Sequence, residues 1–174
     1  MKKIELLAPA GDLERLKIAF LYGADAVYIG GPSLSLRANA INFTLDEIKE
    51  GVEYAHKLKK KVYVTVNIVL HNEEIKEVKK YLKNLEECKV DAIIVSDPTI
   101  VAIALALTNL EMHLSTQAST TNSEACAYWK DKGVSRIVLA RECSKDNIKN
   151  IIDNVDIEIE TFIHGALCIS YSII

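Results

Sequence analysis

The chain has 174 residues, of which 49% are hydrophobic and 26% are charged. This length and this balance are typical of one globular domain with a single core. The formal net charge of −3 provides no basic field to hold a nucleic-acid backbone, so the composition argues against nucleic-acid binding by this chain alone.

The sequence contains no stretch that predicts a membrane role. The apolar run at residues 100–107 is far shorter than the roughly 18 residues of a spanning helix, and it indicates a buried helix. Two lysines near the start resemble those of a secretion signal, but Glu5 interrupts the apolar run and Pro9 ends it.

The cysteines are not spaced in pairs, which favours free thiols in a reducing compartment. We therefore expect a cytoplasmic protein. The cysteines stand at Cys88, Cys126, Cys143 and Cys168.

Short β-rich runs alternate with amphipathic helical runs along the whole chain. Seven strands are predicted, at residues 4–8, 26–29, 62–67, 92–95, 112–115, 136–139 and 157–163. Six helices are predicted between them, at residues 12–23, 44–59, 73–88, 98–108, 121–132 and 144–154.

Capping residues mark most of the predicted helix starts. Pro98 is expected at the first helical position after its cap. Glycines at positions 23 and 133 are expected to end two helices. The predicted caps are Thr44 with Glu47 in a capping box, Asn72, Asp97, Thr121 with Glu124 in a second box, and Ser144.

The order of elements predicts parallel strands joined by right-handed helical crossovers. A weak repeat supports this prediction, because residues 23–27, 90–94 and 133–137 each join a helix end to a strand. A doubly wound sheet of seven strands would be complete, whereas a (β/α)8 barrel would need one more helix and one more βα unit.

The barrel is favoured, because no nucleotide-type glycine-rich loop follows the first strand and polar residues follow nearly every strand. The predicted fold class is α/β, a TIM-barrel-like (β/α) repeat with seven parallel strands and six helices, which leaves the barrel incomplete. We expect a single domain over residues 1–174, truncated after the seventh strand.

In either architecture a ligand site is expected at the carboxyl ends of the strands. Asp97 is already explained as a helix cap, and the pair Gly30 and Gly31 is more typical of a tight turn than of a phosphate cradle. The polar residues that follow strands are Tyr28, Arg37, Asn39, Asn67, His71, Ser96, Asp97, Ser115, Thr116, Gln117, Arg141, Glu142, Cys143, His164 and Cys168.

Two groups in this set suggest chemistry. Arg141 and Glu142 are opposite charges directly after an apolar strand. Glu160 and His164 are predicted to share one face of the last strand, and a buried carboxylate at Glu160 would need a partner.

Familiar catalytic signatures are absent from the sequence, including the zinc-binding His-Glu-x-x-His helix, the Gly-x-Ser-x-Gly elbow and the Walker loop. Cys168 and His164 could form a thiolate and base pair, but a spacing of four does not define the geometry of a cysteine peptidase. Cys143 and Cys168 offer two thiolates after neighbouring strands, where an iron–sulfur cluster requires four.

Several segments resemble the collagenase-like peptidase family, peptidase family U32, over nearly the whole chain. The segment Glu160-x-Phe162-x-x-Gly165-Ala166-Leu167-Cys168 is similar to the signature of that family. The other matching segments are residues 5–11, 23–28, 36–40, 42–44, 64–67, 113–118 and 139–142.

The resemblance implies a TIM-barrel-like fold and a bacterial or archaeal cytoplasmic protein. The better-understood members of the family resemble oxygen-independent hydroxylation factors for tRNA, ribosomal RNA or a quinone precursor. They hold a 4Fe-4S cluster by four cysteines, and in some of them prephenate is implicated as the oxygen source. Carried onto this chain, the first cluster cysteine is Cys168 and the other three lie beyond residue 174. The glycine that follows in the family signature is replaced by Ile173, and the chain then stops.

The favoured hypothesis is that the chain is a fragment of a member of this enzyme family, with a pocket for a small acidic cosubstrate. Such a fragment cannot hold a four-cysteine cluster by itself. One alternative is a genuine collagenase-like peptidase that uses Cys168 and His164. Another is a non-catalytic domain that self-associates through the open edges at strands one and seven. The candidate catalytic residues are His164, Glu160, Arg141 and Glu142, the candidate substrate-binding residues are Arg37, Asn39, Asn67 and Gln117, and the candidate metal ligand is Cys168.

Overall fold

A computed structural model of the chain describes residues 4–31 and 42–165. Within this part of the chain, one parallel sheet of seven strands pairs each strand with its neighbour in sequence, in the order β1 to β7. The strands are β1 (Leu7–Pro9), β2 (Ala26–Gly30), β3 (Lys61–Val66), β4 (Ala92–Val95), β5 (Met112–Leu114), β6 (Arg136–Val138) and β7 (Glu158–Glu160).

Helices connect the successive strands of this sheet. Two short 3-10 helices, η1 (Asn72–Glu74) and η2 (Thr116–Ala118), accompany the α-helices. The α-helices of the described residues are α1 (Leu13–Leu21), α2 (Leu45–Lys57), α3 (Ile75–Glu87), α4 (Pro98–Leu107), α5 (Ser123–Asp131) and α6 (Lys145–Asn154).

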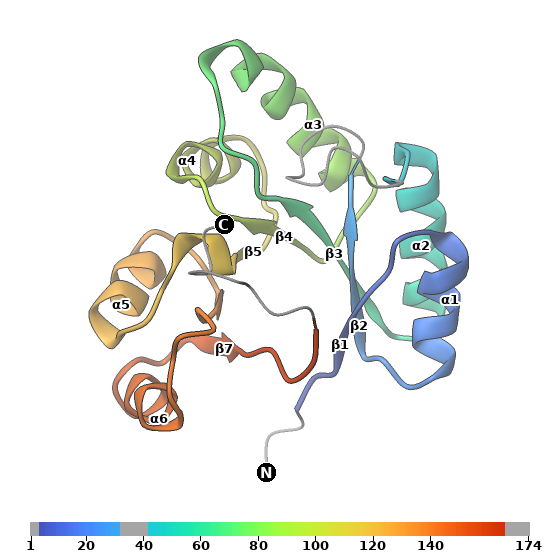
Figure 1. Ribbon diagram of the computed structural model, residues 1–174. Helices are drawn as coiled ribbons and strands as arrows, with labels where there is room; N and C mark the ends of the chain where they lie inside the picture. Colours follow the sequence, from blue (N-terminus) through green and yellow to red (C-terminus); the bar gives the residue numbers. More distant parts are fainter. Residues whose placement is uncertain (1–3, 32–41, 166–174) are drawn as a thin grey trace.

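The strand order identifies the architecture as an open half-barrel. In a doubly wound sheet the order would reverse at a switch point, whereas here it never does. Figure 1 shows the helices outside the curved sheet and the ring of helices open between α6 and α1, where β7 and β1 are the edges of the sheet. The predicted TIM-barrel-like fold with an incomplete barrel is confirmed.

The main core lies between the sheet and the helices. Leu16 of α1, Ile48 of α2, Leu82 of α3 and Ile100 of α4 are fully buried there against the apolar side chains of the strands. A second cluster of buried residues surrounds Ile151 of α6. These helices therefore attach to the sheet by burial of apolar surface, the dominant favourable term in folding.

The inner face of the half-barrel differs from the outer core. Its apolar cluster contains only Ala26, Tyr63, Ala92 and Ile94 as buried members among the described residues. Barrel interiors are usually filled by bulky branched side chains. Here polar and charged side chains share the inner face with this small cluster.

The helix starts follow the predicted chemistry, with two corrections. Thr44, Asp97 and Ser144 accept hydrogen bonds at the starts of α2, α4 and α6, as expected. The cap of α5 is Asn122 and not Thr121, because the Asn122 side chain accepts from the Ala125 N–H at 2.9 Å.

The start of α3 was predicted wrongly. Asn72 does not cap it, because residues 72–74 form η1 and the helix begins at Ile75. The backbone N–H of His71 donates to the Glu74 carboxylate at 2.8 Å, which stabilises this 3-10 turn ahead of the helix. No helix of the described residues is long and apolar enough to cross a membrane.

The ends of α2 and α3 contain a feature that the sequence did not reveal. Lys59 and Lys89 follow these helices with φ angles of 58° and 60°, in the left-handed region. Gly23 and Gly133 hold the equivalent positions after α1 and α5, with φ angles of 104° and 83°. A side chain in this conformation is strained, whereas glycine adopts it readily.

Replacing Lys59 by glycine is therefore expected to raise the free energy of unfolding by about 0.5–1 kcal/mol. Urea denaturation followed by circular dichroism would measure the change. Glu53→Gly, at an exposed position inside α2, is the matched control, and it is expected to lower the free energy of unfolding by about 1 kcal/mol. Equal losses in the two variants would show that Lys59 is not strained.

Candidate functional site

Two of the predicted substrate-binding residues meet at the carboxyl ends of β3 and β5. The Asn67 side-chain amide donates to Gln117 Oε1 at 2.7 Å, and the buried Ser115 hydroxyl donates to the same oxygen. Gln117 lies in η2, the 3-10 turn that begins after Ser115 beyond the end of β5. These bonds fix the orientation of the Gln117 amide.

The remaining polar atoms of this pair can serve a ligand. Neither the Gln117 Nε2 nor the Asn67 Oδ1 forms a hydrogen bond with another described residue. One is a donor and the other is an acceptor, so together they suit a neutral polar group such as the edge of an amide or of a nucleobase.

Asp97 has the structural role that the sequence predicted. Its carboxylate accepts from the Thr99 N–H at 2.6 Å as the cap of α4. It also accepts from the Leu70 N–H at 3.2 Å, which ties the segment after β3 to the start of α4. This second bond holds the segment that follows Asn67.

The residues after β6 and β7 form another part of the same barrel end. The Arg141 guanidinium lies over the ring of Phe162, with 4.4 Å between the Cζ atom and the ring centroid. Arg141, Glu142 and His164 are all exposed. The contact joins the ends of two neighbouring strands by a cation–π interaction.

The predicted common face of Glu160 and His164 is wrong. The strand β7 ends at Glu160, so residues 161–165 leave the sheet and the alternation of a strand does not continue to His164. Glu160 lies against Arg136 instead, with 3.6 Å between Glu160 Oε2 and Arg136 Nη1. Burial raises the pKa of Glu160, and the guanidinium lowers it in part.

Arg136 is a buried residue of this region that was not among the predicted site residues. It is buried, with 8% of its surface exposed, and it lies on the inner face at the start of β6. Its guanidinium donates to Glu5 at 2.6 Å and to Glu158 at 2.8 Å. The available signal was a charged residue at the head of an otherwise apolar strand.

A buried histidine lies beside this network. His113 of β5 is 1% exposed, and its ring meets the ring of Tyr63 edge-on, with 4.6 Å between centroids. Burial lowers the pKa of His113. His113 Nε2 lies 3.4 Å from Glu111 Oε1, and the hydrogen bonds of Glu111 with His113 and Ser135 lower the pKa of Glu111 to about 2. His113 Nδ1 has no partner among the described residues.

The cysteines of the described part do not fit an iron–sulfur cluster. The Cys88 and Cys143 thiols donate to the carbonyls of Leu45 and Thr120, at 3.8 Å each. Burial raises the pKa of both thiols, and it raises the pKa of Cys126 to about 11. A thiol with a raised pKa is a poor metal ligand at neutral pH.

The described residues also contain no group of three or more His, Cys, Asp or Glu side chains that could hold a metal ion. Arg37, Asn39 and Cys168 lie outside the described residues.

Two surface depressions lie away from the carboxyl ends of the strands. One, of about 460 Å³, is lined by Leu13, Ile18 and Tyr54 with neighbouring residues of α1. The other, of about 210 Å³, lies near Glu5 and Lys61. Neither lining includes a predicted site residue, so the strand ends remain the candidate site.

The chain is similar in sequence to curated proteins that are named for RNA modification. It is 55% identical over 172 residues to the tRNA hydroxylation protein P1 of Bacillus subtilis, covering 98% of this chain and 41% of that protein. It is 43% identical over 170 residues to the 23S rRNA 5-hydroxycytidine C2501 synthase of Escherichia coli, covering 98% of this chain and 26% of that protein.

A third relative is named differently. The chain is 44% identical over 177 residues to an uncharacterized protease of Methanocaldococcus jannaschii, covering 99% of this chain and 42% of that protein. The chain thus spans about two fifths or less of the length of these curated relatives.

The family of the chain follows from the match of its sequence to a protein-family model. A solved U32 peptidase has the same fold, with a TM-score of 0.74 at 16% identity over 91% of this chain and 68% of that one. The model described as Peptidase family U32 matches residues 11–173. The chain therefore belongs to peptidase family U32, as its sequence motifs indicated.

Proposed function

We propose that this chain is the open-barrel part of a cytoplasmic protein that takes part in the hydroxylation of tRNA. The 55% identity to the tRNA hydroxylation protein P1 of Bacillus subtilis, over 98% of this chain, carries the proposal. The relation to the 23S rRNA 5-hydroxycytidine C2501 synthase of Escherichia coli supports RNA as the class of substrate.

The site is proposed at the carboxyl ends of the strands. The amides of Asn67 and Gln117 form its polar floor and hold the edge of a nucleobase, for which their geometry provides one donor and one acceptor. Arg141 follows β6 and contacts Phe162 beyond the end of β7, and its guanidinium is suited to a small acidic cosubstrate. The acidic net charge implies that the rest of the protein holds the RNA backbone.

Further residues of this site are proposed from the family resemblance. Arg37 and Asn39 would contact the substrate, and Glu142 and His164 would exchange protons with it. Cys168 would bind a 4Fe-4S cluster together with cysteines outside this chain, and such a cluster supplies one-electron chemistry.

A chimaera tests the proposal. In a Bacillus subtilis strain that lacks its tRNA hydroxylation proteins P1 and P2, the matching 172 residues of P1 would be replaced by this chain. Mass spectrometry of tRNA nucleosides would measure the product that is heavier by one oxygen atom. We expect the chimaera to restore this nucleoside. A folded chimaera that produces none would refute the proposed function.

Single variants of the chimaera test the floor of the site. Asn67→Ala and Gln117→Ala are each expected to lower the hydroxylated fraction of tRNA about 10-fold, because each removes a polar contact worth about 1.4 kcal/mol. Asn150→Ala, an exposed change on α6, is the matched control and should leave the fraction unchanged. Full hydroxylation in both site variants would show that the substrate site lies elsewhere.

Peptidase activity is the second candidate, because one relative is named an uncharacterized protease. The described residues favour it less, since His164 is exposed, whereas the imidazole of a catalytic triad is oriented by a buried carboxylate. If the chimaera cleaves gelatin, and Cys168→Ala or His164→Ala abolishes the cleavage, this candidate replaces the first.

A further inference from the structure

We infer that Arg136 is a positioning residue that bridges the two edges of the open barrel and sets the distance between β1 and β7. The described parts of these strands form no ladder with each other, so backbone hydrogen bonds do not fix their separation. Arg136, on the strand next to β7, extends along the inner face to Glu5, which precedes β1 by two residues.

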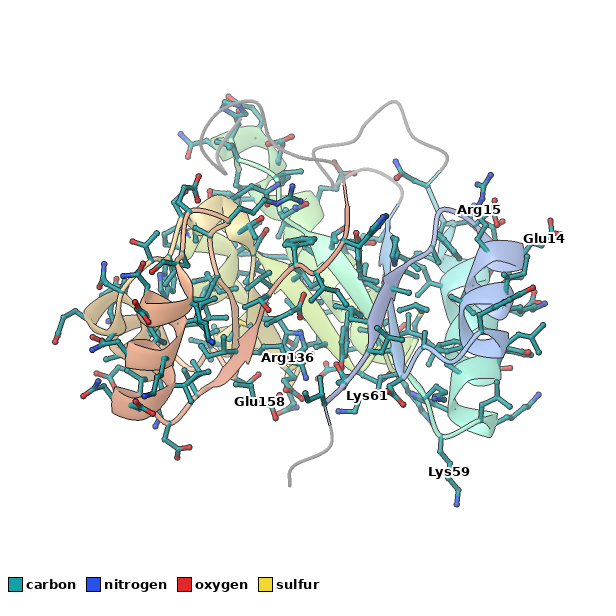
Figure 2. All side chains as sticks on the ribbon, turned by 60° about the horizontal axis from the view of Figure 1, so that its bottom comes forward. Glu14, Arg15, Lys59, Lys61, Arg136 and Glu158 are labelled. Carbon is teal, nitrogen blue, oxygen red and sulfur yellow. The ribbon has the colours of Figure 1, made fainter. Side chains whose placement is uncertain are left out.

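The geometry of the bridge uses the whole guanidinium. Nη1 donates to Glu5 at 2.6 Å, Nη2 and Nε donate to one oxygen of Glu158 at 2.8 and 3.1 Å, and Nη1 lies 3.6 Å from Glu160. A planar fork of this kind holds carboxylates on two sides in a fixed geometry, whereas a lysine ammonium is a compact charge whose three donors rotate freely. Figure 2 shows Arg136, Glu158 and Lys61 at the same end of the barrel.

Glu5 is held from a second side, which makes the bridge continuous across the barrel. The Tyr63 hydroxyl of β3 donates to both Glu5 oxygens, at 2.9 and 3.0 Å, and the Lys61 ammonium lies 4.0 Å from Glu5. The guanidinium itself lies 5.3 Å from the centre of the Tyr63 ring. Side chains of β3 and β6 therefore contact Glu5 just ahead of β1, and Arg136 connects Glu5 to the carboxylates of β7.

The charges around Arg136 explain why the bridge can set the distance between β1 and β7. Three carboxylates surround one buried guanidinium, so without Arg136 the carboxylates at the two edges would repel each other. With it, both edges are drawn to the same point. The bridge thus replaces, at the amino-terminal end of the barrel, the strand pairing that the edges lack.

The position of the candidate site depends on this bridge. Phe162 and His164 follow β7 directly, whereas Asn67 follows β3 on the other side of the barrel. A change in the separation of the edges would move the first two residues relative to the third. This consequence rests on the proposed function, but the bridge itself does not.

Hydrogen–deuterium exchange of the chain, read by mass spectrometry, tests the bridge directly. In Glu5→Gln, which keeps the shape of the side chain and removes its charge, we expect the amides of residues 6–10 and 158–163 to exchange at least 10-fold faster. The exchange of the amides of β3 and β4 should become faster only by the factor that corresponds to the loss of global stability, measured by urea denaturation. Arg136→Lys, which keeps the charge and loses the fork, should give the same local pattern.

Lys60→Met is the matched control, because it removes an ion pair with Asp25 at 3.1 Å near the start of β2 without touching Arg136. It should leave the exchange of β7 unchanged. Equal acceleration in all strands of Glu5→Gln, or none at the two edges, would overturn the bridge. If the edges loosen but the unsubstituted chimaera makes no hydroxylated tRNA, the proposed function fails while the bridge stands.

Discussion

Replacing Arg136 by methionine is expected to lower the free energy of unfolding by about 3–5 kcal/mol, because it breaks a buried ion-pair network. The methionine would fill much of the space but leave Glu5, Glu158 and Glu160 without their counter-charge. Glu158 is 44% exposed, so water can stabilise part of the excess charge and the loss should lie at the lower end of this range.

The measurement is urea denaturation at pH 7, with the midpoint and the slope compared between the variant and the original chain. Arg15→Met is the matched control. Arg15 also pairs with a carboxylate, Asp12, at 2.7 Å, but its side chain is 67% exposed, so its loss is expected to change stability by less than about 1 kcal/mol. Similar losses in the two variants would contradict a buried network.

The pH dependence of the same variant provides a second check with a definite sign. Burial raises the pKa of Glu160, so this group takes up a proton earlier in the folded state than in the unfolded chain as the pH falls. Protonation removes one of the charges that Arg136 compensates. The loss in free energy of unfolding caused by Arg136→Met should therefore become smaller as the pH falls from 7 towards the ordinary pKa of a glutamate. A deficit that grows on acidification would contradict this account.

Replacing Gly31 by alanine is expected to lower the free energy of unfolding by about 1–3 kcal/mol, because the site is overpacked. A Cβ atom at Gly31 would overlap the Tyr81 hydroxyl and lie 2.7 Å from Tyr81 Cζ. Tyr81 is buried on α3, so its ring cannot move away without disturbing the core. Glycine is needed at position 31 because the Tyr81 side chain leaves no room for a Cβ atom.

A double-mutant cycle measures this contact. The Tyr81 hydroxyl is buried without a hydrogen-bond partner among the described residues, so Tyr81→Phe alone should be neutral or slightly stabilising. Combined with Gly31→Ala it should restore part of the stability, but not all, because the ring carbon stays close. Gly11→Ala, whose Cβ would meet only an ordinary contact at 3.4 Å, is the control and should change stability by less than about 0.5 kcal/mol. Additive effects of the two substitutions would disprove the overlap.

The same glycine shows where local interpretation stops. The pair Gly30 and Gly31 suggests a tight turn when the sequence is considered alone. In the structure Gly30 ends β2, neither glycine has a positive φ, and the residues after Gly31 that such a turn would include lie outside the described residues. The reason for Gly31 is a tyrosine fifty residues later in the chain. No pattern within a few residues could have revealed it.

Features with a local cause were predictable. The alternation of apolar runs predicted seven strands and six helices, because the period of burial differs between strands and helices. The caps at Thr44, Asp97 and Ser144 were predictable because a capping side chain bonds to a backbone N–H only two or three residues away. The meeting of Asn67 and Gln117 followed from parallel strands, whose carboxyl ends lie at one end of the barrel.

The sequence alone thus determined the class of fold, most of the helix starts and the end of the barrel at which the polar residues gather, since each depends on short-range periodicity or on a neighbouring residue. Only the tertiary structure decided the length of β7, the left-handed residue Lys59 and the pairing of Arg136 with Glu5, which are 131 residues apart. A charged residue at the head of a strand can be a solvated end or the centre of a buried network. Which of these it is depends on what distant segments place beside it, and that is a property of the folded chain.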